Sequence, residues 1–92
     1  MPYIRQSERD ILDPYVDALI TAVDSVRAGS MAGYLNYAIT RLLLGTLLAE
    51  PSYLQIATTT GVLDNVKYEM YRKLAASYED KKAKENGEVY PT

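Results

Sequence analysis

Tyrosine and arginine side chains recur at helical spacing in the middle of the chain. Tyr34, Tyr37 and Arg41 would share a sector of about 60° on an α-helix, because successive residues lie about 100° apart around the axis. An aromatic ring can stack on a nucleobase, and a guanidinium group can hold a phosphate. The pattern favours a site for an anionic ligand that carries a ring, such as a nucleotide. Asn36, between the two tyrosines, is a further candidate ligand-binding residue.

A second group of similar residues lies further along the chain. Lys67, Tyr71, Tyr78 and Lys82 line one face if a helix runs through this region, and Arg72 follows Tyr71. We predict that Lys67, Tyr71 and Arg72 bind the same ligand. Both groups equally suit cation–π and salt-bridge packing at a subunit interface, and this alternative stays open.

The residues required by the common catalytic arrangements are missing. The chain has no cysteine and no histidine, which excludes thiolate and imidazole zinc sites and Cys-His or Ser-His-Asp catalysis. Glu79 and Asp80 are adjacent and would point about 100° apart on a helix, so they cannot form a converging acid–base pair alone. The five glycines stand singly, so no glycine-rich phosphate loop is present. We expect no enzyme, no cofactor and no metal; a carboxylate-metal hydrolase assembled from several chains is the enzymatic alternative.

Length and composition favour self-assembly. We expect the 92 residues to form one helical domain, 1–92. A chain of this length buries only about 60–65% of its unfolded surface, yet 48% of its residues are hydrophobic. Oligomerisation is the usual way to stabilise so small a core without disulfides or metals. The aromatic residues are nine tyrosines, with no phenylalanine or tryptophan, and tyrosine suits half-buried interfaces and ligand pockets.

The net charge and the lack of a secretion signal limit the binding partners and the cellular location that we expect. A net charge of −2 excludes binding to nucleic acid through general electrostatic attraction. The first ten residues contain no apolar run of the kind found in secretion signals, so we expect a cytoplasmic protein. Asn36, Thr40, Arg41 and Gly45 argue against a membrane span in the most apolar segment.

The first helix is predicted to begin at Asp13-Pro14, which suit the N-cap and first helical position. Residues 7–12 would form a separate turn, because proline inside a helix costs about 3 kcal/mol. The helix would stop at Ala28-Gly29. Its apolar face consists of Val16, Leu19, Ile20, Val23 and Val26.

The second helix is predicted to run from near Ser30 to about Ala49, with Arg41 as its only charged residue from position 31 onward. Leucines surround the axis, and a helix that is apolar on nearly all sides is buried on nearly all sides. We therefore place it at the centre of an oligomer. One of its faces carries Leu35, Ile39, Leu42 and Thr46.

The third helix is predicted to start after the N-cap Ser52 and to continue past Arg72. The threonines at 58–60 have poor helix propensity, which predicts a bend or a close helix crossing at Gly61. A last helical piece, 78–85, would end with Gly87 as a left-handed cap, so that Val89 and Tyr90 fold back onto a surface of the same or another chain. The third helix's core stripe is Leu63, Val66, Met70 and Leu74.

Three strings carry a resemblance to a known family. They are GYLNYAIT at 33–40, GVLDNVKYEMYRKL at 61–74 and YEDKKAKENGEVY at 78–90. Together they resemble an uncharacterised family of phage and bacterial proteins of similar length. Asp64 stands where the family pattern has Glu, and Glu88 where it has Asp. Relatives often carry Pro at the position of Ser77, which implies a helix break before Tyr78.

The resemblance implies a phage context, although the family has no settled activity. Small oligomeric phage proteins are often counter-defence factors, and some sequester the nucleotide signals of bacterial immune systems such as Thoeris and CBASS. We therefore predict an all-α homo-oligomer, a small bundle of three to four helices, in the cytoplasm of the bacterial host. It would bind a cyclic ADP-ribose-type molecule or a cyclic dinucleotide between subunits, without turnover. The alternative is a structural or protein-interaction module with no small ligand.

Overall fold

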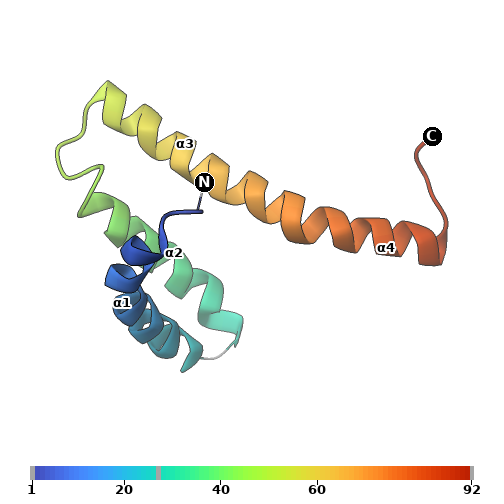
Figure 1. Ribbon diagram of the computed structural model, residues 1–92, viewed down its shortest axis with the longest axis horizontal. Coiled ribbons are helices and arrows are strands. Elements are labelled where there is room, and N and C mark those ends of the chain that lie inside the picture. Colours follow the sequence, from blue (N-terminus) through green and yellow to red (C-terminus); the bar gives the residue numbers. More distant parts are fainter. Residues whose placement is uncertain (1, 27, 92) are drawn as a thin grey trace. The chain divides into compact units, whose positions relative to one another are not determined.

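The computed structural model describes residues 2–26 and 28–91, and its regular elements are all helical. In chain order they are α1 (Gln6–Asp24), α2 (Ala28–Leu44), α3 (Tyr53–Met70), the π-helical turn η1 (Tyr71–Ala75) and α4 (Ala76–Asn86) (Figure 1). No strand occurs among the described residues. The all-α prediction is confirmed.

The internal contacts divide the chain into two compact units. One comprises residues 2–59, and the other begins at residue 60, inside α3. The expectation of a single domain spanning 1–92 stays a prediction.

Helix α1 begins earlier than predicted and passes through Pro14. The Glu8 carboxylate accepts the Arg5 N–H at 3.0 Å, and the Gln6 side-chain amide donates to Asp10 at 2.8 Å. These bonds stabilise the first turns, where four N–H groups lack helical partners. They hold the segment before Pro14 in helical geometry despite the N–H that proline lacks. The predicted start at Asp13-Pro14, with a separate turn at 7–12, is wrong.

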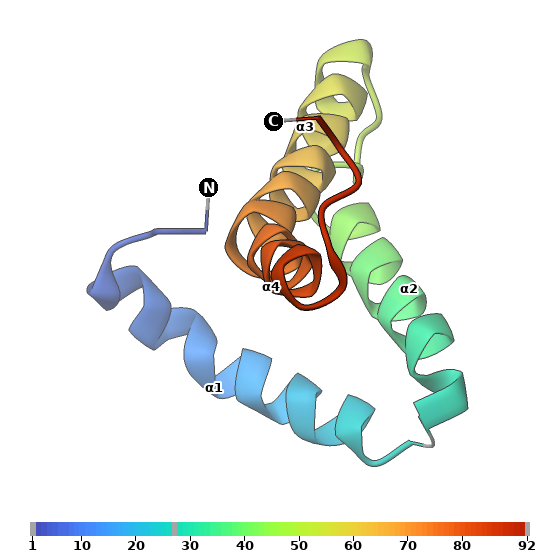
Figure 2. The same cartoon turned by 90° about the vertical axis from the view of Figure 1, so that its right-hand side faces the viewer.

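The connection between α1 and α2 lies before Ala28-Gly29, so the predicted stop there is also wrong. Ser25 ends α1: its N–H donates to the Thr21 carbonyl at 3.2 Å and its hydroxyl to the Ala22 carbonyl at 2.6 Å. Gly29 does not adopt the positive φ of a glycine cap and belongs to the first turn of α2. Figure 2 shows α1 and α2 meeting at this short connection.

Helix α2 ends at Leu44, five residues before the predicted end near Ala49. Residues 45–50 form turns in which the Leu48 N–H donates to the Leu43 carbonyl at 2.9 Å. The Thr46 hydroxyl also bonds back to the Leu42 carbonyl at 2.7 Å. Gly45 is a poor helix former, and this local bonding competes with a further helical turn.

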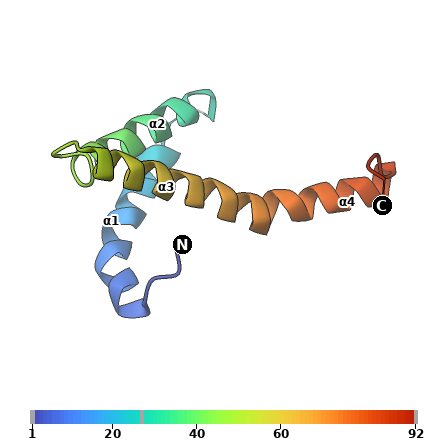
Figure 3. The same ribbon diagram turned by 90° about the horizontal axis from the view of Figure 1, so that it is seen from above.

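Ser52 is the N-cap of α3, as predicted: its hydroxyl accepts the Gln55 N–H at 3.2 Å. The backbone is then helical from Tyr53 to Asn86 (Figure 3). The Thr58 and Thr59 hydroxyls bond to carbonyls four residues earlier, at 2.8 and 2.7 Å. No neighbouring atom lies within 4 Å of a Cβ placed on Gly61. The predicted close crossing is therefore absent from the described chain.

The predicted helix break before Tyr78 is wrong, because η1 leads directly into α4. Gly87 ends α4, with φ 97° and ψ 141°. The prediction of a positive φ is confirmed, but this ψ is far from the left-handed helical value of about 47°. Such a conformation is open essentially only to glycine.

The segment after Gly87 leaves α4 instead of packing along it (Figures 1 and 2). The Glu88 carboxylate accepts the N–H groups of Val89 and Tyr90, both at 2.8 Å. This turn leaves the Val89 side chain 90% exposed and the Tyr90 side chain 81% exposed. The residues that the structure describes leave both side chains largely uncovered, although both line a shallow hollow with α4.

The described residues contain no buried apolar side chain; the one buried residue among them is Thr59. In residues 2–59, the predicted apolar stripe of α1 lies opposite the face of α2 that carries Leu35, Ile39 and Leu42, and both stay partly open. Each face was predicted, but their contact was not. The predicted core stripe of α3 is wrong for the single chain, because its four side chains are 43–68% exposed. Within the described part, no helix has the length and apolar character to cross a membrane.

Candidate functional site

The face of α2 holds an arginine and a tyrosine in direct contact. An Arg41 Nη1 N–H donates to the Tyr37 hydroxyl at 2.9 Å, and the guanidinium carbon lies 5.8 Å from the centre of the Tyr37 ring. One turn of helix separates the two residues, which brings their side chains together. The sequence prediction that they share a face is confirmed by this contact.

Arg41 has no carboxylate partner in the part of the chain that the structure describes. Helix α2 contains neither Asp nor Glu. A guanidinium group has five N–H donors, and the Tyr37 hydroxyl takes one of them. The remaining donors can hold an anion.

A hollow of about 600 Å³ lies beside this pair, at the start of α2. Gly29 and Gly33, four residues apart, leave the helix surface open there, because neither has a side chain. Tyr34 and Tyr37, 51% and 64% exposed, form its aromatic wall. The lining residues are Gly29, Ser30, Gly33, Tyr34 and Tyr37. The glycines and Ser30 were not predicted as site residues, although the i, i+4 spacing of the glycines is visible in the sequence.

Of the four predicted ligand residues on α2, Tyr34 and Tyr37 line the hollow, whereas Arg41 and Asn36 do not. Arg41 reaches it only through its contact with Tyr37, and Asn36 makes no such contact. It lies about 100° around the helix axis from Tyr37, and its side-chain amide donates to the Ala32 carbonyl at 3.0 Å. The side chain is thus bonded to its own helix.

The second predicted group lies in the other unit, and its polar side chains contact acidic or aromatic neighbours. Arg72 pairs with Glu69 at 2.7 Å, and the Lys67 ammonium lies 5.8 Å from the Tyr68 ring centre. The Tyr71 hydroxyl donates to Glu79 at 3.1 Å. The two carboxylates make this face less favourable than that of α2 for an anionic ligand.

The π-helical turn explains why Tyr71 meets Glu79. Residues eight apart in a regular α-helix point about 80° apart. A π-turn closes its hydrogen bonds over five residues instead of four, so it rotates the following residues less per step. The turn at 71–75 thereby brings Glu79 toward the face of Tyr71. Neither the turn nor this contact was predicted.

In a comparison with protein-family models, one model matches nearly the whole chain. The model of a domain of unknown function, DUF6899, matches residues 1–89 of the 92. The chain belongs to the DUF6899 family. This confirms the predicted membership of an uncharacterised family. No curated protein and no solved structure matches the chain.

Metal chemistry finds no support in the described residues of this DUF6899 chain. They include no group of three or more Asp and Glu side chains placed to hold a metal ion.

The Tyr71–Glu79 contact predicts that the stability of the folded state depends on pH. The hydrogen bond to Glu79, and then the negative charge of that carboxylate, raise the pKa of Tyr71 above its usual value of about 10. The folded state thus favours the neutral phenol. Its contribution to stability is fully present below pH 10 and is lost as the pH rises through the raised pKa.

Ultraviolet titration checks this by subtracting the curve of Tyr71→Phe from that of the wild type. The difference should report one phenol that ionises later than the other tyrosines. In Glu79→Ala, which removes the two largest causes, the pKa of Tyr71 should fall back toward the usual range. A raised pKa that persists in Glu79→Ala would show that Glu79 is not its cause.

Proposed function

We propose that this protein is a non-catalytic binding subunit that sequesters an anionic, nucleotide-derived signal as part of a homo-oligomer. Its role would be that of a phage-type counter-defence protein. The ligand class is a cyclic dinucleotide or a cyclic ADP-ribose-type molecule, because each combines phosphates with a base that can stack.

The observation that carries this proposal is Arg41, a cation without a carboxylate partner in the described chain, bonded to Tyr37 beside an open hollow. A phosphate would accept the remaining guanidinium N–H groups. A base would stack on the ring of Tyr34 or Tyr37, whose faces are partly exposed. The two glycines leave space for the ligand to approach the backbone of α2.

Self-assembly is supported by the exposed apolar surface. Monomeric soluble proteins rarely expose contiguous apolar patches larger than a few hundred Å². In this chain each described α-helix carries large apolar or tyrosine side chains that are more than one-third exposed. Copies that cover one another would also shield the hollow on α2 from water, and a shielded site strengthens the contact between arginine and phosphate.

A thermal-shift panel of cyclic dinucleotides and ADP-ribose-type cyclic molecules tests the ligand. A ligand at 100 times its dissociation constant adds about 2.7 kcal/mol of stability, which raises the melting temperature of a domain this small by on the order of 10 °C. Arg41→Ala should lose the shift and keep its oligomeric state. Tyr37→Phe should keep part of it, because the ring remains.

Lys81→Ala is the matched control, since it removes a cation on α4 and should keep the full shift. The bound compound should be recovered unchanged after incubation, because the protein is not expected to turn it over. If no compound in the panel changed the melting temperature of the wild type, the proposed ligand class would be rejected. A second candidate function would then remain.

The second candidate is a structural or protein-interaction module with no small ligand. The absence of buried apolar side chains among the described residues favours it, because that surface needs a protein partner whether or not a ligand binds. In this case Arg41→Ala and Tyr37→Ala would change assembly rather than ligand response.

A further inference from the structure

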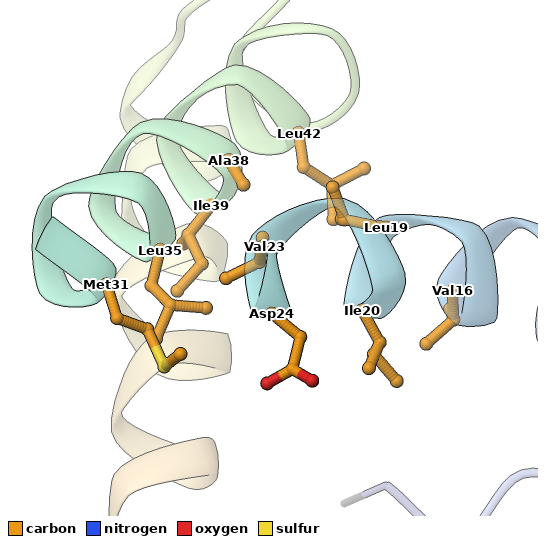
Figure 4. A pocket seen from close by; sticks show the side chains of 10 residues that line it. All are labelled: Val16, Leu19, Ile20, Val23, Asp24, Met31, Leu35, Ala38, Ile39 and Leu42. Carbon is orange, nitrogen blue, oxygen red and sulfur yellow. The ribbon is translucent and has the colours of Figure 1, made fainter. Parts of the chain in front are cut away.

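Helices α1 and α2 enclose an apolar groove of about 290 Å³ (Figure 4). Nine of its ten lining residues are apolar, and Asp24, the last residue of α1, is the exception. The close-up shows Val16, Ile20 and Met31 pointing toward the same open side. The other lining residues are Leu19, Val23, Leu35, Ala38, Ile39 and Leu42.

The groove lies within residues 2–59 and is only half covered. Six of its large side chains are 44–64% exposed: Val16, Leu19, Ile20, Leu35, Ile39 and Leu42. In a folded core such side chains lose nearly all contact with water. Figure 2 shows α1 and α2 diverging from their connection, so the apolar side chains between them face an open side that a second copy could fill.

We propose that the α1–α2 groove is the self-association interface and that its occupant is the same groove of a second copy, related by a two-fold axis. This specifies the assembly on which the proposed function rests. A two-fold interface brings the same patch from both copies together, so the patch must complement itself. A continuous apolar surface meets this requirement.

The exposed area is sufficient for such a contact. Each half-exposed side chain leaves on the order of 100 Å² open, so two facing grooves would bury roughly 1,200 Å², the lower end of specific protein interfaces. The other apolar side chains of α1 and α2 extend this area at its margins.

The single charge in the groove is compatible with the same arrangement. Asp24 lies at the end of α1, about 12 Å along the axis from Val16. With the α1 helices of the two copies antiparallel, the Asp24 carboxylates lie at opposite ends of the interface. Like charges are then separated, and both carboxylates stay at the solvent-exposed rim.

The absence of cysteine allows a direct test with single-cysteine variants of the full chain. Ile20→Cys places a thiol in the groove, at a side chain that is already 58% exposed and therefore tolerant of change. Ala18→Cys is the matched control on the same helix, because residues two apart point about 160° apart. Each variant is labelled with a maleimide, and its mass is measured by light scattering at the same concentrations.

At concentrations where the mass is that of an oligomer, we expect the thiol of Ile20→Cys to react at least tenfold more slowly than the thiol of Ala18→Cys. Dilution to the monomer should remove the difference. Equal rates in an oligomer would reject this interface while leaving the proposed ligand and assembly standing. A monomeric mass at every concentration would reject the inference together with the assembly, whatever the thermal-shift panel gives.

Discussion

Replacing Ile39 by aspartate should separate the subunits and remove the cooperative thermal transition. Ile39 lies on α2 in the apolar groove and is 46% exposed in the single chain. Burial of such a side chain contributes about 1.5–3 kcal/mol, and an unpaired carboxylate in an apolar interface adds a further desolvation cost. We expect a loss of more than about 3 kcal/mol, a large part of the total stability of a small domain.

Circular dichroism melting and light scattering would measure this effect. Ile11→Asp is the matched control, because Ile11 is 69% exposed and does not line the groove. It makes the same chemical change and should cost less than about 1 kcal/mol. If Ile39→Asp melted and assembled like the wild type, the groove would be a solvent-exposed surface in the native protein.

Removal of residues 88–92 is the second change that we expect to have a large effect on stability and assembly. Gly87 turns the chain, and the Glu88 carboxylate accepts the next two N–H groups in a compact turn. The described residues nevertheless leave Val89 and Tyr90 largely exposed. An ordered turn that presents two apolar side chains fits docking on another copy. Loss of both burials would cost about 3–6 kcal/mol.

The expected result is a lower melting temperature together with a smaller assembly. Removal of residues 91–92 alone is the control, because it keeps Val89 and Tyr90 and should change neither measurement. A truncated chain with unchanged melting and mass would show instead that the tail is a solvated end.

The sequence predicts which segments of the chain are helical, but it does not predict several of the residues at which the helices begin and end. The spacing of Val16, Leu19, Ile20 and Val23 correctly predicts the face of α1 that meets α2. The start of α1 was predicted wrongly because of Pro14. Proline inside a helix costs a limited free energy, and hydrogen bonds elsewhere in the helix can offset it. These offsetting bonds involve side chains before the proline, whose contribution the apolar pattern does not show.

Glycine misled the prediction at the other end of α1. The sequence predicts a helix stop at Gly29, yet this residue lies inside α2, and Ser25 ends α1 by bonding to the preceding turn. The positive φ of Gly87 is predicted correctly. The two glycines differ in context: a charged helix and an apolar tail flank Gly87, whereas helix-compatible residues follow Gly29.

The candidate site was only partly visible in the sequence. The Tyr37–Arg41 contact follows from one turn of helical spacing, so it could be predicted. The contact between Tyr71 and Glu79 could not, because it depends on a π-turn that no periodicity of 3.6 residues reveals. The pairing of Arg72 with Glu69 is different, because its i, i+3 spacing is visible in the sequence.

Light scattering across a dilution series tests most directly whether other copies complete the missing core. We predict a particle mass that is a multiple of 10.3 kDa at micromolar concentration. On dilution, the mass should fall and the helical signal should weaken with it, because the separated chain has no buried apolar core in its described residues. A particle of 10.3 kDa that keeps its full helical signal and a sharp thermal transition at every concentration would contradict self-assembly as the source of the core.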